Sequence, residues 1–189
     1  MMPRDMCIAE LARRRHERMI IVAAYHAAFD LMRVSPHPLN FVSIGAMGLG
    51  YSHALGLALG RPDMQVVVLD GDGSLLMNLG TLVTIGEAAP PNLVHCVCEN
   101  GIYEANGGVP VPGRGKVDFA AIALAAGYRD ATVFNELEDF AQRLPQLLAA
   151  TGPVFATLRI VPGAASKKDY ATIHGPQPRS AFRAALRAR

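Results

Sequence analysis

Short runs of hydrophobic residues alternate with segments of helical spacing along most of this chain. The runs are rich in β-branched residues and predict strands at residues 19–25, 39–44, 65–69, 93–98, 130–134 and 154–161. The segments between them predict helices at residues 5–17, 26–33, 49–59, 75–88, 119–126 and 137–149. Such alternation is typical of an α/β fold with helices on both faces of a parallel sheet. We therefore expect three layers built on a mostly parallel, six-stranded sheet.

The length of the chain limits the number of domains. It has 189 residues, of which 51% are hydrophobic, and this fits one domain with a substantial core. We interpret residues 1–189 as a single domain that begins with the helix at 5–17 and ends in a tail at 162–189. The tail is expected to be irregular up to Pro178 and to finish in an arginine-rich helix from Ser180 onward.

Charge and hydropathy exclude some classes of function. The net charge is only +2 and the longest basic run is Arg13-Arg14-Arg15, so nucleic-acid binding is not expected. No apolar stretch reaches the roughly 18 residues of a membrane span. The N-terminus also lacks the apolar core of a secretion signal, and a cytoplasmic location without membrane contact is expected.

The cysteines do not suggest a disulfide framework. Of Cys7, Cys96 and Cys98, the latter two alternate on an apparent strand and are expected to face opposite sides of the sheet. We interpret Cys96 and Cys98 as packing residues on opposite faces of one strand, and all three thiols as reduced.

Polar and glycine residues gather where the predicted strands end. Gly45, the turn Gly71-Asp72-Gly73-Ser74 and Asn100 each follow an apolar run, and Asn100 comes 28 residues after Asp72. Since ligands of parallel sheets bind at the carboxyl ends of strands, these segments are expected to meet. Glycines let backbone N–H groups approach phosphate oxygens, and Mg²⁺ prefers oxygen ligands such as a carboxylate and an amide. The pattern therefore predicts a diphosphate held through a divalent metal.

The same residues resemble a known signature. Gly71-Asp72-Gly73 followed by Asn100-Gly101 is similar to the motif of thiamine diphosphate (ThDP, also called thiamine pyrophosphate) enzymes. Residues 41–128 resemble the diphosphate-binding domain of sulfopyruvate and phosphonopyruvate decarboxylases. The motifs that carry this resemblance are Gly45-Ala46-Met47-Gly48, Leu69-Asp70-Gly71-Asp72-Gly73, Leu76-Met77-Asn78-Leu79-Gly80-Thr81-Leu82, Asn100-Gly101-Ile102-Tyr103 and Asp118-Phe119-Ala120-Ala121-Ile122-Ala123.

The resemblance implies roles for individual residues. Asp72, Asn100 and the backbone carbonyl of Ile102 would bind Mg²⁺, and Met47 would wedge the bound cofactor into a V. The remaining implied cofactor contacts are Gly45, Ala46, Gly71, Gly73, Ser74 and Tyr103. Ser74 also fits a helix N-cap, and Met47 also fits an ordinary core position.

Other positions leave alternatives open. No catalytic residue is assigned with certainty, and His26 is a candidate that could instead be structural. Tyr25 and His26 stand where the family has a small-residue turn, Glu99 replaces Asn or Asp, and Val109 replaces Gln. The cationic side chains of Arg114 and Lys116 are candidates for contact with an anionic substrate, or are simply solvated.

The resemblance also implies a partner. ThDP needs an activating Glu that this superfamily places on a pyrimidine-binding domain, which a chain of this length does not contain. We therefore expect the β subunit of a split 2-oxo acid decarboxylase in a hetero-oligomer, α2β2 or larger, with 3-sulfopyruvate as the first substrate hypothesis. Phosphonopyruvate decarboxylation, ThDP-dependent carboligation and a non-catalytic cofactor-binding or assembly subunit are the alternatives.

Overall fold

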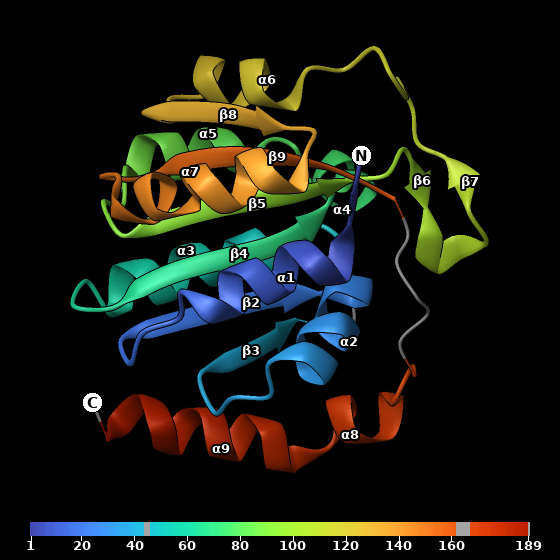
Figure 1. Ribbon diagram of the computed structural model, residues 1–189. Coiled ribbons are helices and arrows are strands. Elements are labelled where there is room, and N and C mark those ends of the chain that lie inside the picture. The colour runs from blue at the N-terminus through green and yellow to red at the C-terminus, as the bar shows by residue number, and fades with distance from the viewer. Residues whose placement is uncertain (44–45, 162–166, 189) are drawn as a thin grey trace.

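The computed structural model describes residues 1–43, 46–161 and 167–188 and is built on one large parallel sheet (Figure 1). The strand order is β1-β9-β5-β4-β2-β3, and β8 also pairs with β9. The strands are β1 (Met2–Pro3), β2 (Met19–Ala24), β3 (Asn40–Ser43), β4 (Gln65–Gly71), β5 (Leu93–Glu99), β8 (Asp130–Phe134) and β9 (Val154–Val161). All these pairings are parallel. Within the described residues, the two-residue β1 is added to the six predicted strands.

Helices cover both faces of this sheet, which confirms the predicted three layers. Helices α1, α2 and α7 lie on one face, and α3, α5 and α6 on the other (Figure 1). The helices are α1 (Arg4–Arg13), α2 (Tyr25–Val34), α3 (Gly50–Gly60), α4 (Asp72–Met77), α5 (Thr81–Ala88), α6 (Phe119–Ala125), α7 (Leu137–Ala149), α8 (Tyr170–His174) and α9 (Pro176–Arg187). A short hairpin of β6 (Ile102–Tyr103) and β7 (Val109–Pro110) encloses the 3-10 turn η1 (Glu104–Asn106).

The central strands are buried on both sides because successive side chains point to opposite faces. In β2, Ile21 and Ala23 join the core beneath α1 and α7, whereas Ile20 and Val22 join the core beneath α3 and α5. All six residues of β2 are buried. Such a strand reads in the sequence as a continuous apolar run rather than an alternating one.

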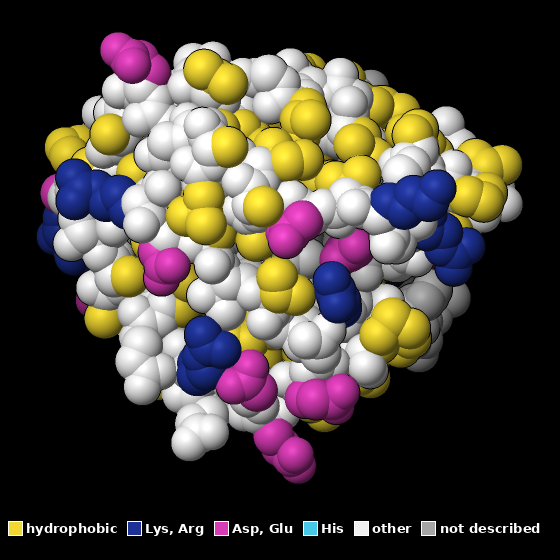
Figure 2. Space-filling view, turned by 90° about the horizontal axis from the view of Figure 1, so that it is seen from above, with side chains coloured by type: hydrophobic (Ala, Val, Ile, Leu, Met, Phe, Trp, Pro, Cys, Tyr) yellow, Lys and Arg dark blue, Asp and Glu magenta, His cyan; other side chains and the backbone are white. Residues whose placement is uncertain are grey.

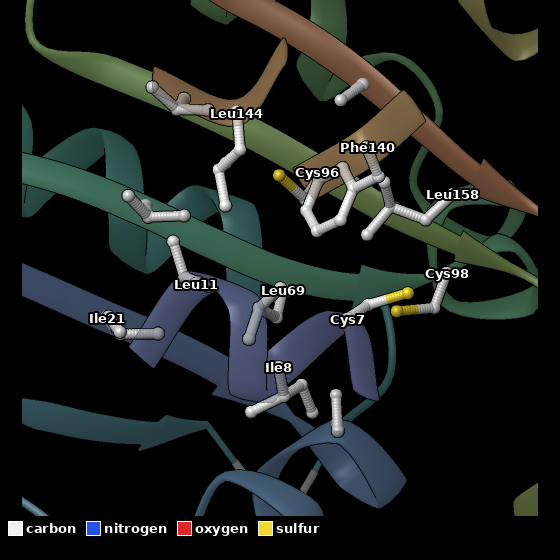
Figure 3. Packing of buried hydrophobic residues seen from close by; sticks show 14 of the residues in the cluster. Cys7, Ile8, Leu11, Ile21, Leu69, Cys96, Cys98, Phe140, Leu144 and Leu158 are labelled. Carbon is white, nitrogen blue, oxygen red and sulfur yellow. The ribbon is translucent and has the colours of Figure 1, made fainter. Parts of the chain in front are cut away.

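Figure 3 shows the core on the α1 and α7 side, where Leu11 and Phe140 pack over the sheet. Cys7, Cys96 and Cys98 all belong to this cluster and are free thiols. The expectation that Cys96 and Cys98 face opposite sides was wrong, because residues two apart on a strand share a face. Burial raises the pKa of the Cys98 thiol to about 12, in keeping with a packing role.

Two predicted helices have different bounds in the structure. The helix predicted for 5–17 ends at Arg13, because the following residues turn the chain into β2 and Arg15 donates to the Met19 carbonyl at 3.2 Å. The helix predicted for 75–88 is divided into α4 and α5. The division occurs at Asn78, whose backbone leaves the helical region and whose Nδ2 donates to the Gly48 carbonyl at 2.9 Å.

The C-terminal tail is more regular than predicted. Residues 162–166 lie outside the described ranges, but α8 and α9 occupy most of the stretch that follows. Helix α9 begins at Pro176 rather than Ser180, since the fixed φ of proline suits the first turn of a helix. None of the helices in the described ranges is long and apolar enough to cross a membrane.

The surface over β8 and α6 mixes side-chain types (Figure 2). Hydrophobic side chains spread over much of it, and Leu124 of α6 is among the exposed large hydrophobic residues. Basic and acidic side chains are interspersed among them. This face therefore carries no field of a single sign.

A buried aromatic cluster surrounds His95 at the centre of β5. The His95 ring stacks on Tyr51 with centroids 5.2 Å apart, and its Nδ1 lies 2.9 Å from the Tyr128 hydroxyl. Phe155 closes the cluster edge-on at 5.0 Å. Burial lowers the pKa of His95 to about 3, so the ring is neutral in the folded protein near neutral pH.

Replacing His95 should change how stability depends on pH. In the unfolded chain, His95 binds a proton below its ordinary pKa of about 6.5, whereas in the folded chain it does so only near pH 3. Between these two pH values the proton favours the unfolded chain, so His95 lowers the stability of the fold as the pH falls. The slope from one such group is about 1.4 kcal/mol per pH unit. We expect His95→Gln to be less stable than the wild type at pH 7, with the gap closing towards pH 5.

Urea denaturation at pH 5, 6 and 7 measures this effect. Parallel pH profiles for the wild type and His95→Gln would contradict it.

Candidate functional site

The carboxyl ends of β2, β4 and β5 open into a cavity. It forms there because parallel strands end at the same edge of the sheet and their loops diverge. Of the predicted site residues, those that line the cavity are His26, Met47, Gly71, Asp72, Gly73, Ser74, Asn100, Ile102 and Tyr103. The structure thus brings together segments from four parts of the chain.

Asp72 is the central polar residue of the cavity. Its side chain is only 2% exposed, and its two oxygens accept hydrogen bonds from the backbone N–H groups of Gly101 at 2.7 Å and Gly73 at 2.9 Å. Burial raises the pKa of this carboxyl, and the hydrogen bonds only partly oppose that rise. The carboxylate therefore ties the turn after β4 to the turn after β5 and keeps a costly negative charge at the cavity wall.

Asn100 lies in the same cavity with its amide orientation defined. Its Oδ1 accepts from the Ile102 N–H at 3.0 Å, and its Nδ2 donates to Glu104 Oε2 at 3.2 Å. The turn between them depends on Gly101, which has a φ of +73°. An amide oxygen, a carboxylate and the Ile102 backbone are thereby brought close at one site.

Gly71 and Gly73 differ in what surrounds them. A Cβ on Gly73 would lie 2.6 Å from the Tyr103 ring, so this glycine is needed for protein packing. A Cβ on Gly71 would meet no atom within 4 Å. The open space beside Gly71 adjoins the cavity and is available to a ligand.

Ser74 has a role that sequence reasoning missed. Its Oγ accepts a hydrogen bond from the Gly48 N–H at 2.8 Å, and Asn78 holds the carbonyl of the same Gly48. Helix α4 therefore fixes the turn that carries Met47. Ala46 is exposed and does not line the cavity, and Gly45 lies outside the described residues.

His26 lies at the other side of the cavity, at the start of α2. Its Nε2 is 3.7 Å from Glu104 Oε1, and burial lowers its pKa more than the nearby Glu104 raises it. Tyr25 before it has a φ of +49°, a left-handed conformation that is strained for a tyrosine. This turn is thus made by a bulky residue in a strained conformation.

The two predicted substrate-binding cations lie outside the cavity. Arg114 and Lys116 are exposed, and neither lines it. The Arg114 side chain packs over Gly101, where an added Cβ would lie 2.8 Å from its Nε. Glu99 pairs with Arg159 at 3.3 Å, and Val109 is exposed on β7.

Charged residues that were not among the predicted site residues complete the cavity. Arg4 donates from Nε to Asp30 at 2.7 Å and from Nη1 to Glu104 at 2.6 Å. Although burial raises the pKa of Glu104, its pairing with Arg4 holds the pKa below its ordinary value. Asp70 is fully buried, and burial raises its pKa to about 6. Two of these residues had a signal that sequence reasoning could have used: Asp70 lies inside the motif that contains Asp72, and Glu104 follows Asn100 by four residues in the same loop.

A cation at this site would find several kinds of oxygen ligand. In the described ranges, no cluster of three or more His, Cys, Asp or Glu side chains has a metal-binding arrangement. A cation here would therefore rely on one carboxylate, the Asn100 amide, backbone oxygen and oxygens of the ligand itself.

Comparison with known proteins identifies the family. Residues 21–157 match the model of the thiamine pyrophosphate enzyme C-terminal TPP-binding domain. A phosphonopyruvate decarboxylase of Streptomyces viridochromogenes is 38% identical over 84% of this chain and 39% of its own length. A sulfopyruvate decarboxylase subunit beta of Methanothermobacter thermautotrophicus is 34% identical over 86% of this chain and 84% of its own length.

The fold agrees with solved structures. A thiamine diphosphate-dependent 4-hydroxybenzoylformate decarboxylase of Rhodococcus jostii superposes with a TM-score of 0.73 at 24% identity, over 85% of this chain and 33% of that one. This likeness concerns the fold alone. The chain spans about two-fifths of the phosphonopyruvate decarboxylase it matches and most of the sulfopyruvate decarboxylase beta subunit. With the family model matched over more than half of its length, the chain belongs to the thiamine pyrophosphate enzymes and comprises their C-terminal TPP-binding domain.

Proposed function

We propose that this chain is the diphosphate-binding subunit of a ThDP- and Mg²⁺-dependent 2-oxo acid decarboxylase that is active only with a partner chain. The observation that carries the proposal is the buried Asp72 carboxylate, bonded to the N–H of Gly101 and facing one cavity together with Asn100. We interpret residues 1–189 as a single domain of that enzyme.

The cavity fits a diphosphate held through a cation. The open space beside Gly71 would admit phosphate oxygens close to the backbone. The raised pKa of Asp72 marks a carboxylate that a bound cation would stabilise. Asp70, also at the cavity, is a second fully buried carboxyl whose pKa burial raises.

The residues of this chain would divide the work of binding. Asp72, the Asn100 amide oxygen and the Ile102 carbonyl would hold Mg²⁺, while the turn from Gly71 to Ser74 would contact the diphosphate and Tyr103 would close its side. Met47 would support the bent form of the cofactor. When bound, ThDP supplies the electron sink for loss of carbon dioxide from a 2-oxo acid.

The partner would supply the rest of the active site. A pyrimidine-binding domain with an activating Glu would face this cavity, in a hetero-oligomer of α2β2 type or larger. The relative named a subunit beta supports this division, because this chain covers 84% of that subunit. His26 is a candidate for contact with the substrate, and it lines the cavity.

3-Sulfopyruvate is the favoured substrate, because the subunit-sized relative is a sulfopyruvate decarboxylase. Phosphonopyruvate is the close alternative, since a phosphonopyruvate decarboxylase has the higher identity. A carboligase would use the same cavity. The strained Tyr25 and the replaced Glu99 and Val109 instead favour a binding or assembly subunit without turnover.

Substrate assays with the assembled enzyme separate these possibilities. We expect the co-expressed chains, with Mg²⁺ and ThDP, to release carbon dioxide from sulfopyruvate faster than from phosphonopyruvate or pyruvate. Negligible release from both sulfopyruvate and phosphonopyruvate would remove the decarboxylase assignment. Binding of ThDP without any release would support the non-catalytic alternative.

Asp72→Asn tests the cation site. It keeps the shape of the side chain but removes the charge, so Mg²⁺-dependent ThDP affinity of the complex should fall by about 100-fold or more, beyond the roughly 10- to 100-fold typical of outer-shell changes. Isothermal titration calorimetry measures this affinity, and unchanged binding would refute the metal-ligand role of Asp72. Circular dichroism confirms that the variant is folded.

Gly71→Ala tests the space for the diphosphate. The added methyl meets no protein atom within 4 Å, so the melting temperature should stay unchanged. The methyl would occupy room needed by the ligand, and we expect ThDP affinity to fall by about 10-fold, or about 1.4 kcal/mol. Gly56→Ala is the matched control, because its Cβ is equally free of contacts at an exposed position of α3. Equal ThDP affinity in both variants would argue against a diphosphate at Gly71.

A further inference from the structure

We infer that Glu104 is a positioning residue for the cation site, which orients the Asn100 amide and is itself held by Arg4. This inference rests on the proposed function and extends it to residues outside the family motif. It concerns the side chains that decide which atom of Asn100 faces the cation. Neither Glu104 nor Arg4 would touch cofactor or metal in this role.

A primary amide can be turned by 180° with little change of shape, and only its neighbours distinguish oxygen from nitrogen. Here the Ile102 N–H donates to Asn100 Oδ1, and Glu104 Oε2 accepts from Nδ2. In the turned orientation, two donors would meet at Ile102 and two acceptors at Glu104. Glu104 therefore selects the orientation in which the amide oxygen is kept for a cation.

Arg4 fixes the position of Glu104. Two guanidinium nitrogens donate to the two carboxylate oxygens, at 2.6 and 3.3 Å, and the third donates to Asp30 at 2.7 Å. The side chains of Arg4 and Glu104 are 7% and 24% exposed. Because Asp30 and Glu104 both bind the guanidinium, the Arg4 side chain is fixed, and its two bonds to Glu104 restrict the rotation of that carboxylate.

Arg4 also prevents a competing arrangement. A free Glu104 carboxylate beside Asn100 would itself be an attractive ligand for Mg²⁺. Pairing with Arg4 neutralises that charge, while Asp72 forms no ion pair with another of the described residues and keeps its charge for the cation. The Arg4–Glu104 pair therefore leaves Asp72, and not Glu104, as the carboxylate available to a cation.

Glu99 offers a matched control. It is also acidic and lies immediately before Asn100, and its charge acts on Asp72. Its carboxylate, however, pairs with Arg159 at 3.3 Å. Glu99→Gln thus removes a nearby charge without removing the hydrogen bond to the Asn100 amide.

The test measures ThDP binding to the assembled complex while Mg²⁺ is varied. For Glu104→Ala we expect the Mg²⁺ concentration for half-maximal binding to rise by about 10- to 100-fold, as is typical when an outer-shell partner is lost. Saturating Mg²⁺ should restore ThDP affinity. Glu99→Gln should stay within about twofold of the wild type, because the amide keeps its partner.

Arg4 is tested through Glu104. Arg4→Met should raise the Mg²⁺ requirement, and the double variant Arg4→Met/Glu104→Ala should be no worse than Glu104→Ala alone, because Arg4 acts through Glu104. Arg4→Lys, which keeps the charge but cannot bond Asp30 and both Glu104 oxygens together, replaces Arg4→Met if that variant does not fold.

Three results would overturn the inference. They are an unchanged Mg²⁺ requirement in Glu104→Ala, an equal rise in Glu99→Gln, and a loss of ThDP binding that saturating Mg²⁺ does not restore. The first result would show that Glu104 does not support the cation site. The second would show that any nearby negative charge has the same effect. The third would show that Glu104 serves only to maintain the structure. If the wild-type complex itself shows no Mg²⁺-dependent ThDP binding, the proposed function fails instead.

Discussion

The candidate site depends on one buried carboxylate. Asp72 holds the turns after two neighbouring strands together by accepting one backbone N–H from each, at 2.7 and 2.9 Å. Because the strands are parallel, their carboxyl ends already lie at one edge, and this carboxylate fixes how their loops meet. Asn100, Gly71 and the β6–β7 hairpin then take positions relative to it. The candidate site thus combines ordinary sheet geometry with a buried carboxylate that no cationic side chain among the described residues neutralises.

A second set of hydrogen bonds joins this centre to the rest of the cavity. Helix α4, which begins at Asp72, reaches the Gly48 N–H through Ser74 and the Gly48 carbonyl through Asn78. The motif after β4 and the turn before α3 are therefore held together by hydrogen bonds. The position of the turn after β4 is thereby linked to that of Met47, which also lines the cavity.

The sequence predicted those parts of the site that follow from local rules. Apolar runs and strand-end glycines located β4 and β5, and hence Asp72 and Asn100, because the motif residues are close in sequence to the strands that carry them. Arg4 and Asp30 escaped notice, since their contacts join residues 26 and 100 positions apart. Ser74 was a predicted site residue, but its bond to the Gly48 N–H was not predicted, because a helix-start serine has several partners within reach. The tail was predicted only in part for another reason: α8 has just five residues, and the prolines at the start of α9 read as breaks although Pro176 suits a first turn.

The charges of the cavity explain why it should respond to a cation. Of the acids that line it, Glu104 is neutralised by Arg4 and has a lowered pKa, whereas Asp70 and Asp72 have pKa values raised by burial. The uncompensated negative charge is thus concentrated at the turn after β4, where it opposes folding. A divalent cation bound there would remove that cost, and a group that binds only the folded chain stabilises it by mass action. Ligand binding and the stability of this edge of the sheet are therefore expected to be coupled through Asp72.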